Sequence, residues 1–300
     1  MKLQIYYTIL SDSFKMASTL TDEKAFKKLQ REEYFKQYYD KSLRPDGRQG
    51  LVSTRPVSIS VGSVSSADGS SIVKQGETII VCGIKLELAR PMTERPNMGF
   101  IVPNITLSPS CHAQFKPGAP SEEAQIASTF LHQVILNSKV LPLENLCIAE
   151  GKWVWTVYVD LTCFNFAGNI LDASVKALTA ALRDLKVPKV ELVPSDDGNT
   201  DDCEIAVDIE KRSPLKLGPM PVACTVAMFE ESLLLDPTDE EEALAQTVIT
   251  VVLTSENEVC HVHKPGGAPV SHEIMQQCIN FAKKNFKKVE HFILVASNEQ

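Results

Sequence analysis

The sequence predicts an α+β protein made of two related halves, in each of which strands are followed by a helix. Short segments with a strand-like alternation of apolar and polar residues dominate the start of each half. Longer segments with apolar residues at helical spacing follow them, at residues 121–139 and 173–185 in the first half and 271–289 in the second. Because this order occurs twice, we expect two βα halves that form one domain.

The elements follow from local patterns. Acidic residues precede lysines in the segment 22–39, as the helix dipole favours. Asp172 is the expected N-cap of the helix 173–185, and Pro188 is expected to follow its end. Strands are predicted at 57–61, 71–74, 78–88, near 99–102 and at 153–161 in the first half, and at 205–209, 222–228, 232–235, 248–253 and 259–263 in the second.

Composition and turn residues divide the chain into five parts. Residues 1–20 are expected to be a disordered N-terminal extension, and residues 21–42 an N-terminal helix. Pro45 and the Asp46-Gly47 turn separate this helix from a first half at 43–193. A polar loop is expected at 194–202, and the C-terminal half occupies 203–300.

Composition also restricts the function. The chain has 300 residues, 44% of them hydrophobic and 23% charged, and a formal net charge of -8. A chain of this length buries about three quarters of its unfolded surface without needing a metal or disulfide. The negative charge argues against a protein coated with nucleic acid, so any RNA contact is expected to be local. Eight cysteines without a CxxC motif favour reduced intracellular thiols, and no segment has the length of a membrane span.

Common catalytic motifs are missing from the sequence, and three weaker clusters remain. Cys260, His261 and His263 resemble metal ligands, but neighbouring residues of a strand point to opposite faces, which disfavours zinc. The acidic run 239–242 is compatible with magnesium ligands and with a solvated turn. The turn that begins at Lys264 is compatible with a phosphate-binding loop and with a hairpin connection. No cofactor is expected.

Several motifs, taken in order, resemble the RNase PH family. The similarity extends from about residue 43 to 289 and is greatest to the non-catalytic ring subunits of the eukaryotic RNA exosome, the branch similar to the archaeal second ring subunit. It implies an RNase PH-like fold with a ribosomal-protein-like first half. The motifs are Leu43-Arg44-Pro45-Asp46-Gly47-Arg48, the turn region 62–70, a proline-rich excursion at 90–120, Glu122-Glu123-Ala124-Gln125, Gly168-Asn169-Ile170-Leu171-Asp172-Ala173, and Asp236-Pro237-Thr238 before Glu240-Glu241-Glu242.

The resemblance also implies that this chain is not an enzyme. Active members degrade RNA from its 3′ end with phosphate, and they need a phosphate-binding arginine, two carboxylates for magnesium and a pair of arginines near the excursion. Here Ile170 falls at the arginine position, and isoleucine offers neither charge nor paired donors. Glu242 falls at the first carboxylate position, but Val248 replaces the second. Lys116 is the nearest cation to the missing arginine pair.

The remaining expectations concern RNA and partners. The resemblance implies a six-membered ring of homologous subunits arranged as heterodimers, cap subunits with RNA-binding folds, an associated exoribonuclease and single-stranded RNA in a central channel. Arg90, Arg95 and Lys116 are the candidate channel residues, with ordinary exposed cations as the alternative. The implied locations are the nucleus, nucleolus and cytoplasm, in ribosomal RNA maturation and messenger and nuclear RNA turnover. Two alternatives are an active phosphorolytic exoribonuclease and a free-standing RNA-binding regulator, which the net charge disfavours.

Overall fold

The computed structural model describes residues 27, 29–194, 203–255 and 258–298. The predicted extension at 1–20 and nearly all of the predicted loop at 194–202 lie outside these residues. The chain divides into two compact units, residues 1–53 and 54–300, and each is described by itself.

The first unit contains one described helix and a closed turn. Helix α2 (Arg31–Tyr39) buries Tyr34, Phe35 and Tyr39, and the rings of Tyr34 and Phe35 meet edge to face at 5.7 Å. The predicted turn follows, with Gly47 at a φ of +88°. Arg48 Nε donates a 2.6 Å hydrogen bond to Asp46 Oδ2 within this turn.

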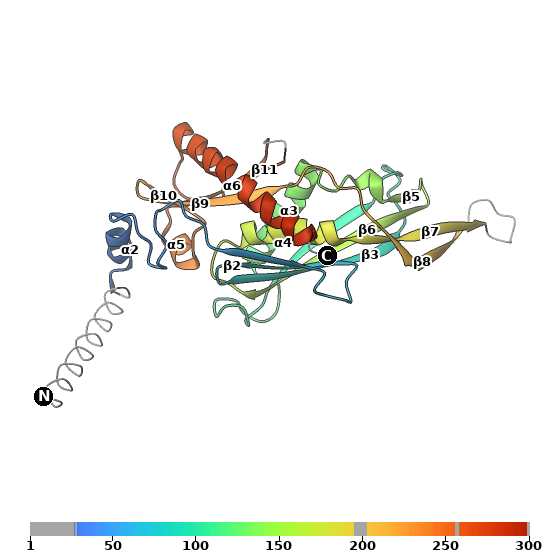
Figure 1. Ribbon diagram of the computed structural model, residues 1–300, viewed down its shortest axis with the longest axis horizontal. Coiled ribbons are helices and arrows are strands. Elements are labelled where there is room, and N and C mark those ends of the chain that lie inside the picture. Colours follow the sequence, from blue (N-terminus) through green and yellow to red (C-terminus); the bar gives the residue numbers. More distant parts are fainter. Residues whose placement is uncertain (1–26, 28, 195–202, 256–257, 299–300) are drawn as a thin grey trace, which may run out of the picture. The chain divides into compact units, whose positions relative to one another are not determined.

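The second unit begins with a six-stranded sheet (Figure 1). Strands β1 (Val57–Val61), β2 (Gly69–Gln75) and β3 (Thr78–Ala89) form the predicted antiparallel meander. Strand β6 (Trp153–Asn165) pairs with β3, and β4 (Phe100–Leu107) lies parallel to β6 at the edge. This edge is blocked against further pairing, because Pro103 has no N–H and Ile105 N–H donates to Ser128 Oγ at 3.0 Å.

Two helices pack against the first sheet. Helix α3 (Glu122–Ser138) packs against β4, and α4 (Ile170–Asp184) packs against β2 and β3. All residues of α4 from 172 to 182 are buried. The small side chains allow close contact: a Cβ atom at Gly69 would lie only 2.8 Å from Ala181 O. Helix α4 is therefore the central element of this unit.

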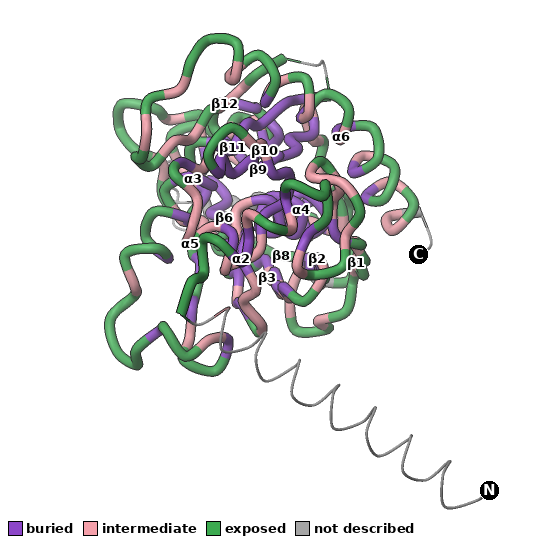
Figure 2. Tube along the Cα trace, turned by 90° about the vertical axis from the view of Figure 1, so that its left-hand side faces the viewer, coloured by how far each residue is buried: buried purple, intermediate pink, exposed green. Residues whose placement is uncertain are grey.

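A second, four-stranded sheet lies on the other side of α4 (Figure 2). Its order is β10 (Ser232–Leu235), β9 (Val222–Phe229), β11 (Thr247–Leu253) and β12 (Val259–His263). Ala223 and Val252 join the core around α4, whereas Val251 and Leu253 pack against the long helix α6 (His272–Asn298). The expected α+β class is thus confirmed.

Some elements differ from the sequence-based expectations. Helix α4 ends at Asp184, and β7 (Lys186–Pro194) follows at once and pairs with β8 (Cys203–Pro214). Strand β7 was not predicted because Pro188 suggested only a helix end, although a strand in a two-stranded ribbon tolerates proline. The segments η1 (Leu143–Leu146) and β5 (Cys147–Ala149) were not predicted either.

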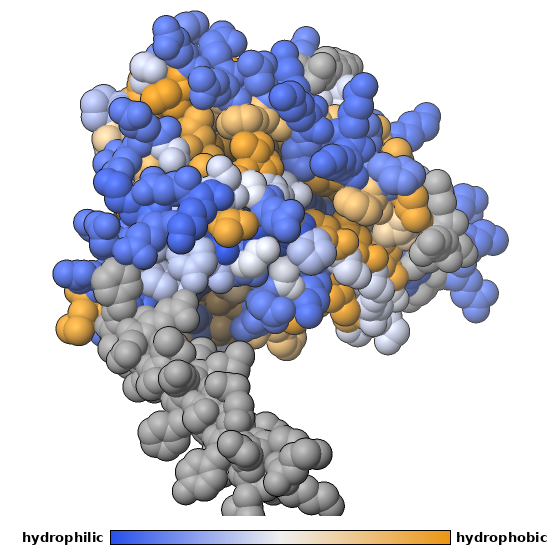
Figure 3. Space-filling model, turned by 60° about the vertical axis from the view of Figure 1, so that its left-hand side comes forward, coloured by the Kyte–Doolittle hydropathy of each residue, from blue (hydrophilic) through white to orange (hydrophobic). Residues whose placement is uncertain are grey.

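The surface of the protein carries both hydrophilic and hydrophobic side chains. Figure 3 shows one face, on which hydrophilic side chains predominate and hydrophobic side chains gather in patches between them. Among the described residues, no helix has the length and apolar character needed to cross a membrane.

Candidate functional site

An open pocket of about 420 Å³ lies where the beginnings of α3 and α4 meet the second sheet. It brings together the three positions that the sequence singled out for catalysis, Ile170, Glu242 and Val248. The other lining residues are Gln114, Glu123, Ile126, Ala127, Phe166, Asn169, Leu171, Thr225, Asp239, Ala243, Thr250, His263 and Pro265.

The loop before α4 forms one wall of this pocket. Gly168 has a φ of +81°, and a Cβ atom there would overlap the backbone of Thr238 and Asp239. Asn169 follows in the left-handed conformation and is the N-cap of α4, since its side chain accepts from Asp172 N. The expectation that Asp172 caps the helix is therefore wrong: the helix begins at Ile170, two residues earlier than Asp172.

Asp172 instead joins α4 to the second sheet. Its buried carboxylate accepts hydrogen bonds from Thr225 N at 3.1 Å and from Thr225 Oγ1 at 2.7 Å. Thr225 Oγ1 lies 2.8 Å from Thr250 Oγ1 on the neighbouring strand. The sequence gave no local sign of this role, because Thr225 is 53 residues away from Asp172.

Helix α5 (Asp239–Leu244) carries Glu242, the pocket residue that the sequence analysis placed at the first carboxylate position. Thr238 and Glu241 form a capping box at its start, and Glu241 is buried. Glu242 Oε1 accepts a 2.9 Å hydrogen bond from Asn169 N. Burial raises the pKa of Glu242 to about 8, although the hydrogen bond from Asn169 N and the charge of Arg55 oppose the shift. The acidic run is therefore a structured helix, and the alternative of a solvated turn is wrong.

The lining residues offer no basic side chain to an anion and give little support for a metal. None of the lining residues is Lys or Arg, whereas Glu123, Asp239 and Glu242 are acidic. Ile170 and Val248 line the pocket with apolar side chains, which offer phosphate no charge and magnesium no oxygen ligand. In the described part of the chain, no group of three His, Cys, Asp or Glu residues is arranged to hold a metal ion. The residues present therefore do not fit the magnesium that the family's active members use.

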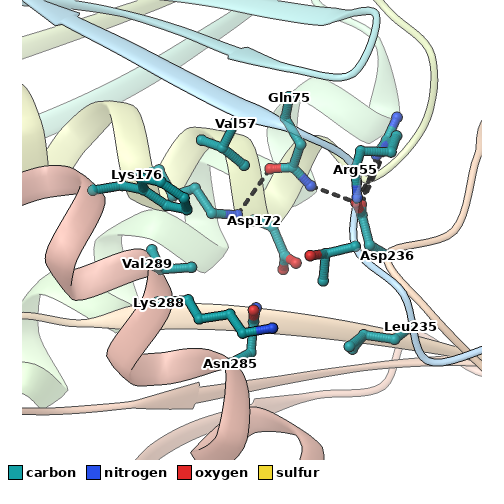
Figure 4. Close-up of a pocket in the computed structure, with 12 residues that line it drawn as sticks. Arg55, Val57, Gln75, Asp172, Lys176, Leu235, Asp236, Asn285, Lys288 and Val289 are labelled. Carbon is teal, nitrogen blue, oxygen red and sulfur yellow. Dashed lines mark hydrogen bonds and ion pairs between the residues drawn. The ribbon is translucent and has the colours of Figure 1, made fainter.

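A buried ionic network lies beside this pocket, around a small cavity of about 30 Å³ (Figure 4). Arg55 Nη2 lies 2.7 Å from Asp236 Oδ1. Gln75 Nε2 donates to the same oxygen at 2.7 Å, and Lys176 Nζ donates to Gln75 Oε1 at 2.8 Å. Burial alone would raise the pKa of Asp236, but the hydrogen bonds and charge of Arg55 outweigh it and hold the pKa well below its usual range.

This network also fixes the loop that forms the pocket wall. Arg55 Nη1 donates to Ala167 O at 2.8 Å, and Asn169 Nδ2 donates to Asp236 Oδ1 at 2.7 Å. The sequence analysis quoted Asp236 only as part of a motif and did not consider Arg55. An arginine before a proline in a loop carries no signal of burial, so its role depends on contacts distant in sequence.

The three candidate channel cations do not lie together. Arg95 is exposed beside a groove that His132 and Leu136 also line, toward the end of α3. Lys116 is exposed near Ser121 and Glu123, at the start of α3. Strand β4, which has eight residues, lies between these two positions in the sequence. A strand of that length spans on the order of 25 Å. Arg90 is exposed at the end of β3, on the same side of β4 in sequence as Arg95.

The histidine cluster and the glycine turn have structural explanations. The rings of His261 and His263 stack at 6.4 Å, and both lie 5.4 Å from the ring of Phe130. Burial lowers the pKa of both histidines. Lys264 Nζ donates to Gly266 O at 2.8 Å, in a turn that leads from β12 to α6 and does not connect two strands. The hairpin interpretation of this turn is therefore wrong. The following cysteines are free thiols: Cys82, Cys111, Cys147, Cys163, Cys224, Cys260 and Cys278.

The two sheets packed around α4 form the α+β architecture that the motifs of the sequence imply. The 3′ exoribonuclease family, RNase PH, matches this chain with its first domain at residues 53–188 and its second at 219–285. The chain belongs to this family, and the resemblance drawn from its motifs is confirmed.

The sequence relatives and solved structures that resemble this chain include several exosome proteins. The exosome complex component rrp43 of Schizosaccharomyces pombe is 37% identical over 87% of this chain and 94% of its own length. The exosome complex component Rrp42 of Methanopyrus kandleri is 35% identical over 83% of this chain and 90% of its own length. A chain of the Archaeoglobus fulgidus exosome, solved with RNA bound to the active site, superposes with a TM-score of 0.75 at 28% identity, covering 87% of this chain and 96% of that one.

Proposed function

We propose that this chain is a non-catalytic subunit of an RNA exosome ring, which supports 3′-to-5′ RNA processing and degradation by assembling the ring and lining its RNA channel. The observation that carries the proposal is the pocket at Ile170, Glu242 and Val248, whose lining contains no cation. Membership of the RNase PH family and the names of the relatives support the ring.

In this proposal, the chain is inactive because the pocket lacks the charged side chains that phosphorolysis requires. Phosphorolysis brings together inorganic phosphate, an RNA phosphate and a metal ion, so its pocket must supply cations for the anions and carboxylates for the metal. Glu123, Asp239 and Glu242 line this pocket, and none of its lining residues is Arg or Lys. A pocket lined by acidic residues, with no basic side chain in its lining, is unfavourable for inorganic phosphate and for an RNA phosphate.

RNA contacts in this proposal come from exposed cations that bind phosphates without reading sequence. Arg90 and Arg95 would act at one end of β4 and Lys116 at the other, so the chain would contact the RNA at two separate levels. The partners proposed are homologous RNase PH-like subunits, cap subunits with RNA-binding folds and an associated exoribonuclease. The proposed locations are the nucleus, nucleolus and cytoplasm, where ribosomal, messenger and nuclear RNAs are processed.

The test combines mass and activity. The tagged chain is purified from its own cells, and the mass of its particle is measured by size-exclusion chromatography with light scattering. The isolated chain is then incubated with single-stranded RNA, magnesium and phosphate. A particle of several hundred kilodaltons together with a silent isolated chain supports the proposal. Release of nucleoside diphosphates by the isolated chain, above a preparation with Glu242→Gln, would show instead that it is an active phosphorolytic enzyme.

A further inference from the structure

The open pocket beside α3 and α4 has the size and the wall of a site for an organic molecule. Its volume of about 420 Å³ falls within the range of small-molecule sites, about 300–1,000 Å³. Apolar side chains from several elements line it, and they include Ile126, Phe166, Ile170, Leu171 and Val248. A ligand with an apolar body gains free energy when it leaves water for such a wall.

The two threonines that line the pocket offer it an acceptor and no donor. Thr225 Oγ1 donates to Asp172 Oδ1 at 2.7 Å, and a hydroxyl group has only one hydrogen atom to give. In the 2.8 Å contact between Thr225 Oγ1 and Thr250 Oγ1, the donor is therefore Thr250. The lone pairs of the buried Thr250 Oγ1 then receive no hydrogen bond from the described part of the chain.

Asn169 likewise has no donor left for a ligand. Its Nδ2 donates to Asp172 Oδ2 at 2.9 Å and to Asp236 Oδ1 at 2.7 Å, and its backbone N donates to Glu242 Oε1 at 2.9 Å. Within the described residues, this last bond is the one hydrogen bond that the Glu242 carboxyl group receives. A ligand that satisfies Thr250 and Glu242 must therefore bring N–H or O–H groups of its own.

The charge of the lining is negative, and neighbouring side chains offset it only in part. The acidic lining residues are Glu123, Asp239 and Glu242. Gln114 Nε2, a neutral donor, lies 3.4 Å from Glu123 Oε2, and His112 Nε2 lies 4.0 Å from Asp239 Oδ2. Neither contact supplies a permanent positive charge to the pocket.

The nearby basic side chains are engaged elsewhere. Lys116 lines a neighbouring hollow, and Lys264 Nζ donates to backbone carbonyls of its own turn. Arg55 acts on Glu242 through its charge, but its guanidinium group is paired with Asp236. His263 lines the pocket, and burial lowers its pKa, so it is neutral at and above neutral pH. A positive charge is thus what the pocket lacks.

We propose that this pocket binds a small organic ammonium ion with an apolar body. The N–H groups of the ligand donate to Glu242 and Thr250, and its apolar body packs against Ile170 and Val248. The inference goes beyond the proposed function, because it assigns a ligand to the pocket and does not depend on the membership of the chain in a ring.

The experiment compares probes that share one apolar body and differ in the head group. The purified full-length chain is titrated by calorimetry at pH 8.5 with 2-phenylethylamine, 2-phenylethanol and phenylacetate. Alkylamines, with a pKa of about 10, are still charged there. Glu242 is mostly ionised, because its pKa is about 8. We expect the amine to bind at least about tenfold more tightly than the alcohol, and phenylacetate to give no measurable binding.

Two substitutions locate the binding site. Glu242→Gln keeps the shape of the side chain and removes its charge from the pocket, and Glu122→Gln removes the same charge from an exposed residue of α3 that does not line the pocket. We expect the first to weaken amine binding about tenfold, and the second to weaken it less than about twofold. Thermal melting shows whether each variant is folded, and the comparison of head groups on wild type depends on neither variant.

The possible results separate this inference from the proposed function. No binding of the amine, equal affinity for amine and alcohol, tighter binding of phenylacetate, or unchanged amine binding by a folded Glu242→Gln would each overturn the ammonium site while the ring function stands. Binding of inorganic phosphate by wild type under the same conditions would contradict the non-catalytic pocket on which the proposed function rests.

Discussion

The ionic network at Arg55 and the pocket at Ile170 are neighbours that shift the pKa of a carboxyl group in opposite directions. In the network, Asp236 accepts from Arg55 and Gln75, and its pKa lies well below the usual range. In the pocket, Glu242 has one backbone donor within hydrogen-bond distance, and its pKa is about 8. The difference is the presence of a guanidinium group. The ion pair of Arg55 and Asp236 joins the segment before β1 to the loop 167–169 and to the end of β10, whereas no Arg or Lys lines the pocket that contains Glu242.

The largest loss of stability should come from breaking the ionic network of Arg55 and Asp236. Asp236→Ala leaves Arg55 buried without its partner, which costs about 3–5 kcal/mol of folding free energy in comparable cases. Denaturant unfolding of the isolated chain measures the loss. The matched control is Glu191→Ala, which removes an exposed ion pair with Lys189 and should leave the unfolding midpoint unchanged. Equal midpoints for the two variants would mean that the network contributes nothing to stability.

The loop between the two regions should be the next most sensitive site. Gly168→Ala puts a Cβ atom at a φ of +81° against the backbone of α5, and we expect a loss of about 2–3 kcal/mol. Gly118→Ala is the control, because Gly118 also has a positive φ but its Cβ would meet open space. The loss there should be about 1 kcal/mol. A smaller loss at Gly168 than at Gly118 in denaturant unfolding would contradict the close packing of the loop on α5.

A smaller effect should appear as a dependence of stability on pH. The folded-state pKa of Glu242, about 8, lies above the ordinary value of 4.5, so the folded chain binds the proton more tightly than the unfolded chain. Stability from this group is complete below pH 4.5, falls as pH rises toward 8, and is level above that. Glu242→Gln should remove this slope, and its stability relative to wild type should therefore rise between pH 4 and pH 8.5, by about 1.4 kcal/mol for each unit by which the folded-state pKa exceeds the ordinary value.

Groups distant from Glu242 contribute equally in both proteins, so the difference between their unfolding free energies reports on Glu242 and on the charges coupled to it, Arg55, Asp172 and Asp236. The unfolding free energy of both proteins is measured by urea unfolding across this pH range. If it changes with pH in the same way for wild type and Glu242→Gln, this prediction is wrong.

The smallest effect should come from restoring a cation to the pocket. Ile170→Arg places a guanidinium group near Glu242, so it should lower the pKa of Glu242 and flatten the same pH profile. It should also create weak phosphate binding, visible as a rise of one or two degrees, roughly, in the melting temperature when phosphate is added. Ile170→Met is the control and should do neither. The single variant should remain inactive on RNA, because Val248 still provides no second carboxylate.

Local patterns predicted most of the fold because each of these elements has its own signal. The alternation in β1 to β3 and the alanine- and leucine-rich sequence of α4 specify elements that tertiary contacts then reinforce. Strand β7 was not predicted because a proline such as Pro188 occurs both after helix ends and in edge strands, so the sequence does not distinguish the two. The capping box of Thr238 and Glu241 was present in the sequence as T-x-x-E and could have identified α5.

The candidate site was only partly predictable. The order of motifs pointed to Ile170, Glu242 and Val248, and these residues line one pocket. Arg55 could not be identified, because its main partner Asp236 is 181 residues away. The raised pKa of Glu242 was equally hidden, since a run of acidic residues suggests exposure and only the packed structure shows which of them loses its water.

The blocked edge of the first sheet bears on the time before a newly made chain finds its partners. Pro103 and the hydrogen bond from Ile105 to Ser128 deny a free strand to other unfolded chains. At the β4 edge, an orphan chain therefore offers little free backbone for strand pairing. Misassembly through side chains is reversible, whereas misassembly through strands tends toward amyloid-like growth. A cell can then keep a surplus of this subunit waiting and recover it by dilution or by exchange.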